Sequence, residues 1–362
     1  MTSLKLTPNP LRTSRLETKE RKNMTEDTAA IKPWRDLTDP RLAADMIDRE
    51  AGLKEPEFEN LEIPEQLGTV RVLVDDHKVK RFAFTQDEYG PWYFDESPFG
   101  GRIGQATLLG NDLVQLFTTV YAASKVVGFH TEEQMWFDSP VKVGEVATLS
   151  GAYVEAYVRR GEGYVVMEAE AIGEDGRSII RHRGVEILKT VPGAIGGRGS
   201  GMPKKRVTGE VPDGARTIST IDSDSQVGDV IAPLVKSITF EQAAVFSRIG
   251  EYVTNTHNSL AAARDGKLAV PIVQGQQQFG LIAQLLVGCF GAGFLTSGWM
   301  QIKFLVPVEV FEQLTITGVI TDIAPDEKGM TRAHLEVWVR RADGRLVTVG
   351  WASAVVPPAL AS

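Results

Sequence analysis

The sequence predicts an α+β protein made of two copies of one unit, in which an antiparallel sheet wraps around a central helix. The first sign is a recurring segment, because "FDSPVKVGEVATLSG" at 137–151 returns as "FLVPVEVFEQLTITG" at 304–318. The second is a long apolar run ahead of each copy, "QATLLGNDLVQLFTTVYAAS" and "GQQQFGLIAQLLVGCFGAG". The third is an Asp-Gly turn between two alternating segments after each copy, which is typical of a β-hairpin.

The two apolar runs are predicted to be the central helices, one in each copy. Both are apolar on nearly every side, so each helix is expected to be buried over most of its surface. The segments that follow, such as "LTITGVITDIAPDEKGMTRAHLEVWVRR", alternate with a period of two and predict antiparallel strands. A shorter helix, such as "TFEQAAVFSRI", is expected before each long one.

Composition narrows the class of protein. The chain has 362 residues, of which 43% are hydrophobic and 24% charged, so it can bury the cores of two domains. A net charge of −8 argues against a broad nucleic-acid-binding surface. Cys289 is the only cysteine, which excludes an intramolecular disulfide and makes the cytoplasm the expected location. The sequence contains no apolar run of the ~18 residues that a membrane span needs.

The chain is predicted to divide into four parts. Residues 1–55 are expected to be a flexible leader, because they lack the hydrophobic segment of a secretory signal. Residues 56–190 form the first repeat and residues 226–362 form the second. Between them, residues 191–225 are rich in Gly and Pro and are predicted to be a linker that crosses the surface.

The most specific motif follows the second short helix. His257 is followed by Ala262-Ala263-Arg264, Gly266 and "PIVQG" at 271–275. With "KFLVPV" and the strand pattern behind it, this run resembles the MaoC-like dehydratase family, which includes the (R)-specific enoyl-CoA hydratases, in its double-hotdog form. The resemblance covers most of both repeats. It implies two hotdog repeats, with a working site in the second.

The resemblance also implies a reaction. These enzymes hydrate an enoyl thioester or dehydrate a 3-hydroxyacyl thioester, with acyl-CoA as the expected substrate and neither a metal nor a redox cofactor. An Asp and a His in the loop before the central helix carry the proton transfers in the family. His257 matches the His, and we expect it to be the main proton-transfer group.

The carboxylate of this pair is missing from the second repeat. Aligned on His257, the Asp position falls on Tyr252, whose ordinary pKa of ~10 makes it a better hydrogen-bond donor than base. Glu251 is the favoured replacement, as a base or as a group that orients the imidazole. Asn255 could instead orient the imidazole or a water.

In the first repeat the same loop reads "DEYGPWY". Glu88 takes the Asp position and Tyr93 takes the His position, so this repeat is expected to be a degenerate site that serves in binding and packing. Trp92, Phe94 and Phe99 form an aromatic group with Tyr93. We expect this group to be core or interface, with a pocket wall for a bulky acyl group as the alternative.

Gly275 is expected at the first turn of the second central helix. Unpaired N–H groups and the positive end of the helix would there stabilise negative charge on a thioester oxygen, and a glycine lets that oxygen approach closely. Gln274 stands where the family often has His, and Gln276 adds an amide to the same turn. These three residues are the predicted oxyanion and substrate-binding group.

Two other functions stay open at this point. One is hydrolysis of an acyl-CoA thioester, and the other is a non-catalytic acyl-CoA-binding or assembly subunit that has lost its acid. The double hotdog could also form a further homodimer. The remaining histidines are expected to be structural or solvated, and no metal site is predicted; they are His77, His130, His182 and His334.

Overall fold

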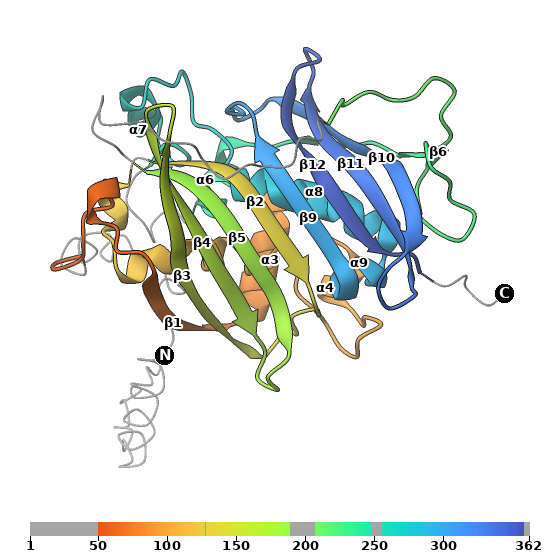
Figure 1. Ribbon diagram of the computed structural model, residues 1–362, viewed down its shortest axis with the longest axis horizontal. Coiled ribbons are helices and arrows are strands. Elements are labelled where there is room, and N and C mark those ends of the chain that lie inside the picture. The colour runs from red at the N-terminus through yellow and green to blue at the C-terminus, as the bar shows by residue number, and fades with distance from the viewer. Residues whose placement is uncertain (1–49, 127, 189–206, 248–254, 358–362) are drawn as a thin grey trace, which may run out of the picture.

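The computed structural model describes residues 50–126, 128–188, 207–247 and 255–357. Within them the strands form a 12-stranded sheet, and the helices lie on one face of it (Figure 1). The main strand order is β1-β3-β4-β5-β2-β9-β12-β11-β10-β7-β6, and β8 pairs with β10. The strands are β1 Glu65–Leu73, β2 Phe129–Phe137, β3 Val146–Arg159, β4 Glu162–Ile172, β5 Ser178–Leu188, β6 Thr217–Ile218, β7 Val230–Ile231, β8 Leu234–Ser237, β9 Gly298–Phe304, β10 Gln313–Pro325, β11 Thr331–Arg341 and β12 Leu346–Val355.

The two repeats join edge to edge through β2 and β9. These strands are antiparallel, and Gln134 lies opposite Gln301 near the middle of the pairing. The sheet is therefore continuous across the seam between the repeats, which places the first repeat beside the second without a gap in the backbone ladder. This confirms the predicted α+β architecture of two similar units.

Each repeat contributes helices to the inner face of the sheet. The α-helices are α3 Asp76–Gln86, α4 Pro91–Phe94, α5 Gly110–Val114, α6 Phe240–Phe246, α7 Leu260–Asp265, α8 Gly275–Phe290 and α9 Ala292–Ser297. The 3-10 helices are η2 Phe58–Asn60, η3 Gln115–Thr119 and η4 Ala123–Lys125. Among these helices we find none with the length and apolar character that crossing a membrane requires.

The central helix of the second repeat is α8, as predicted from its apolar run. Its core residues include Phe279, Leu281 and Leu286, all fully buried. The helix ends at Gly291, whose φ of 60° lies in the left-handed region that glycine tolerates. Cys289, in its last turn, is also buried.

The long central helix predicted for the first repeat is wrong. Its apolar run instead forms the short helix α5 and the 3-10 helix η3. The run contains polar side chains with partners of their own: buried Asp112, inside α5, pairs with Lys78 at 2.6 Å, and the hydroxyl of Thr119, at the end of η3, donates to the carbonyl of Leu116 at 2.9 Å. The first repeat thus surrounds a shorter helical segment than the second.

The short helices α3 and α6 pack against each other across the seam. The rings of Phe82 and Phe246, which the repeat alignment makes equivalent, lie 6.1 Å apart. Lys236, just before α6, donates to the carbonyls of Gln86 and Asp87 at the end of α3, both at 2.8 Å. This cross-repeat cap fixes the loop that follows α3.

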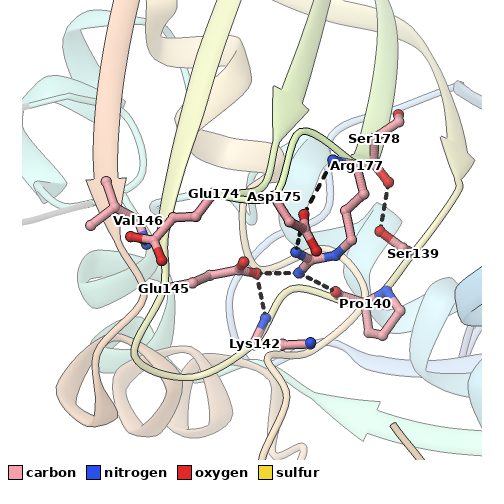
Figure 2. Close-up of polar contacts among 9 residues, drawn as sticks. All are labelled: Ser139, Pro140, Lys142, Glu145, Val146, Glu174, Asp175, Arg177 and Ser178. Atoms are coloured by element: carbon pink, nitrogen blue, oxygen red, sulfur yellow. Dashed lines mark hydrogen bonds and ion pairs between the residues drawn. The ribbon is translucent and has the colours of Figure 1, made fainter.

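In each repeat an arginine near the last β-hairpin forms an ion pair with the same aligned glutamate. Figure 2 shows Arg177 between Asp175, in the β4–β5 turn, and Glu145, before β3, at 2.7 and 2.6 Å. In the second repeat Arg341 pairs with Glu312, the equivalent of Glu145, at 2.8 Å. The two arginines are not equivalent, because Arg177 aligns with Arg345, so the repeats form a similar ion pair from different positions of the hairpin.

Part of the predicted linker packs on the second repeat. Val207 is buried against Trp338 in a small cluster separate from the main core. Trp338 alternates with Val337 and Val339 of the main core, so it points to the other face of the sheet. Val207 thus covers the apolar surface of Trp338 on the outer face, whereas Ile221, later in the same segment, is buried in the main core.

Candidate active site

The loop ahead of each central helix is held by the same backbone contacts in the two repeats. The N–H of Ile103 donates to the carbonyl of Trp92 at 3.0 Å, and the N–H of Ile272 donates to that of Thr256 at 3.2 Å. Tyr93 and His257 directly follow these acceptors. They therefore occupy equivalent places in the fold.

A turn before α7 positions the backbone of His257. The side-chain oxygen of Asn255 accepts from the N–H of His257 at 2.9 Å. The N–H of Asn255 in turn donates to the side chain of Asn258, also at 2.9 Å. Asn255 therefore acts on the peptide of His257, whereas the imidazole is oriented by another group.

That group is the carbonyl of Ile272. It lies 2.8 Å from Nδ1 of His257, so Nδ1 carries the proton as donor and Nε2 is left as a hydrogen-bond acceptor. Burial lowers the pKa of His257 to about 4, although the bond to Ile272 opposes this shift. The ring is thus neutral at ordinary pH, and Ile272, which holds it, lies three residues before the start of α8 in the sequence.

Gly275 is the first residue of α8, as predicted. Its N–H group belongs to the helix turn whose donors have no partner within the helix. A Cβ here would meet the ring of Phe304 at 3.1 Å, so close packing gives a second reason for glycine. Gln274 is the N-cap residue and makes no side-chain cap.

The three glutamines of the first turn point in different directions. Gln277 donates to the carbonyl of Thr85 at 2.9 Å, and Gln278 accepts from the hydroxyl of Thr348 at 2.6 Å. The amide of Gln276 is buried and has no hydrogen-bond partner in the described part of the chain. The Gln276 amide is therefore an unpaired polar group inside the protein, and its oxygen faces Gly110 of the first repeat.

Two of the predicted site residues lie outside the described residues. They are Tyr252, which aligns with the missing Asp, and Glu251, which precedes it. Which side chain replaces the carboxylate stays a prediction.

The equivalent pair in the first repeat is in direct contact. The hydroxyl of Tyr93 donates to the carboxylate of Glu88 at 2.7 Å, and both side chains are buried. Burial raises the pKa of Glu88 to about 7, against the effects of Tyr93 and Lys236, and burial also raises the pKa of Tyr93. The Glu88 carboxylate therefore accepts its hydrogen bond from Tyr93, inside the protein.

Glu133, His130 and His182 form a cluster of titratable side chains near the seam that was not predicted from the sequence. Glu133 lies between two imidazoles, with its carboxylate 2.7 Å from Nε2 of His130 and 2.9 Å from Nε2 of His182. Residues three apart in a regular strand face opposite ways, but the β2–β5 register shifts between His130 and Glu132. This irregularity brings His130 and Glu133 to one face, which strict alternation would not have predicted.

Comparison with known proteins gives matches in structure alone. No family model matches the sequence, and neither does any curated protein. A solved structure described as a MaoC-like dehydratase is 16% identical, with a TM-score of 0.66 over 83% of this chain and 100% of that one. A conserved hypothetical protein from Mycobacterium tuberculosis, described as having a double hotdog fold, is 13% identical, with a TM-score of 0.59 over 83% and 98%.

A third similar structure is larger. The peroxisomal multifunctional enzyme type 2 from Drosophila melanogaster is 14% identical, with a TM-score of 0.54 over 92% of this chain but 56% of that enzyme. At these identities the likeness establishes architecture. The chain therefore has the double-hotdog fold of the MaoC-like dehydratases.

Proposed function

We propose that the second repeat hydrates an enoyl thioester or dehydrates a 3-hydroxyacyl thioester, with acyl-CoA as the substrate. The observation that carries this proposal is a neutral imidazole, His257, bonded to the carbonyl of Ile272, three residues before the amino end of a buried helix. Acid–base addition of water needs these two elements: a base for the water proton and donors for the carbonyl oxygen.

In the hydration direction, Nε2 of His257 would accept a proton from water while the water oxygen bonds to the β-carbon. The electron pair of the double bond moves toward the thioester oxygen, where the N–H groups at the start of α8 would stabilise the enolate. The imidazolium of His257 would then return the proton to the α-carbon. No metal or redox step is needed for this balance, and dehydration is the reverse.

The missing carboxylate has a limited task in this scheme. Because the Ile272 carbonyl already orients the ring, a further residue is needed only to hold the water or to share the proton. Glu251 remains our candidate for that role. We also propose a cytoplasmic location, since a single free and buried cysteine suits a reducing compartment.

The test is turnover of a panel of enoyl-CoA esters by the full chain and by His257→Ala. We expect loss of the enoyl absorbance with the native protein and at least a hundredfold lower rate with the variant. Unchanged turnover in His257→Ala would contradict the assignment. Release of free CoA would indicate a thioesterase, and tight binding without turnover would indicate a binding subunit.

A further inference from the structure

The cluster of Glu133, His130 and His182 is confined to the first repeat. The side chains of Glu133 and His182 are fully buried, and that of His130 is 13% exposed. The repeat alignment places Met300 at the position of Glu133 and Gly350 at that of His182. The fold therefore does not require these groups, and burying them is costly unless they are paired.

One aromatic ring, that of Phe304, lies between the cluster and the second-repeat site. The rings of His130 and Phe304 lie 5.3 Å apart, tilted by 60°. Phe304 in turn lies 3.1 Å from where a Cβ on Gly275 would stand. His130 belongs to β2 of the first repeat, while Phe304 ends β9 of the second, so the contact crosses the seam.

We propose that His130 is a positioning residue for the second-repeat site: held by Glu133, its imidazole fixes the Phe304 ring against Gly275 and so sets the start of α8. The effect on catalysis rests on the function proposed above. The contact between the two rings does not.

Charge gives this contact a dependence on pH. Burial alone would lower the pKa of His130, but Glu133 outweighs it and the pKa is raised. Burial would likewise raise the pKa of Glu133, yet His182 and His130 lower it. The protonated imidazole lies 5.3 Å from the Phe304 ring and attracts it as a cation, and this attraction is lost when His130 loses its proton.

The other charged groups around His130 act in both directions. Glu186 on β5, opposite His130, has a pKa raised by burial, and its charge favours protonated His130. His182 on the same strand shares the Glu133 carboxylate, and Lys303 of β9 pairs with Glu132 at 3.4 Å. Because the Glu133 and Glu186 carboxylates raise the pKa of His130, loss of its proton as the pH rises through this raised pKa should loosen Phe304.

The first experiment is an imidazole NMR titration of the full chain, which requires no turnover. In Phe304→Leu the pKa of His130 should fall by about half a unit, because the cation loses its aromatic partner. Phe137→Leu is the matched control: Phe137 is the repeat equivalent and packs on Phe294 at 4.8 Å, and this variant should leave the pKa unchanged. An unchanged pKa in Phe304→Leu would overturn the proposal.

The second experiment measures kcat against pH. The native rate should decline on the alkaline side, and His130→Gln should remove that limb while lowering kcat about fivefold below it. In the Phe304→Leu background the same change should cost less than about twofold. Equal losses in both backgrounds, or a retained alkaline limb, would refute the positioning role. If the native chain shows no turnover, the proposed function fails and the titration still decides the contact.

Discussion

The loops of the two repeats share a backbone and differ in what their central side chain is bonded to. Tyr93 donates its hydroxyl to Glu88, so the polar atoms of the first loop satisfy each other in the interior. His257 gives one nitrogen to a backbone carbonyl and keeps the other as an acceptor. The comparison teaches that the loop fixes the position of the side chain, while the hydrogen-bond partner of that side chain decides whether it retains an unbonded acceptor.

The largest effect should come from making the second loop like the first. His257→Tyr is expected to lower hydratase turnover at least a hundredfold, because a phenol is a poor base at neutral pH. Tyr93→Phe is the control, and it should leave turnover within about twofold while lowering stability by ~1 kcal/mol. Loss of turnover in Tyr93→Phe would show that the first loop is not a packing element.

A second change tests the closed pair in the first loop. Because the pKa of Glu88 is raised to about 7 in the fold, its protonated form contributes stability below pH 4.5 that is lost as pH rises through 7. Glu88→Gln keeps an acceptor for Tyr93 without the charge, so at pH 8 the free energy of unfolding should rise by up to ~3 kcal/mol. Urea unfolding at pH 5 and pH 8 checks this. The exposed Glu59→Gln is the control, and as a surface substitution it should change the free energy of unfolding at pH 8 by less than about 0.5 kcal/mol.

The fall of the rate at low pH tests the second loop through the pKa of His257. Its folded pKa of about 4 lies below the ordinary 6.5, so the neutral base persists as pH falls and is lost only near pH 4. At pH 5 the rate should exceed that expected for an unperturbed imidazole about thirtyfold. A kcat/KM profile gives the value, and a limb at pH 6.5 would contradict the burial of the ring.

The smallest effect concerns the start of α8. Gly275→Ala should lower stability by ~1 kcal/mol, because the added Cβ meets the Phe304 ring at 3.1 Å. Thermal unfolding of Gly275→Ala alone and combined with Phe304→Leu checks this, and the smaller side chain should relieve the cost. An equal loss in both backgrounds would place the strain elsewhere.

Much of the architecture could be predicted, because the repeat and the apolar run of α8 are both visible as patterns in the sequence. The short α5 could not be predicted, because its run has the same apolar character as that of α8, and tertiary contacts such as that of Asp112 with Lys78 leave no local pattern. The place of His257 before the central helix followed from spacing. The orientation of its ring by Ile272 could not be predicted, because every residue has a backbone carbonyl and no residue type signals this bond.

The seam between β2 and β9 has a consequence for how the chain reaches its folded state. Until residues 298–304 have been synthesised, one long edge of the first repeat has no partner strand. Contacts between residues so distant in sequence form slowly, and open edges favour association with other chains. The nascent first repeat should therefore be the species most prone to aggregate and the one that most needs protection by chaperones.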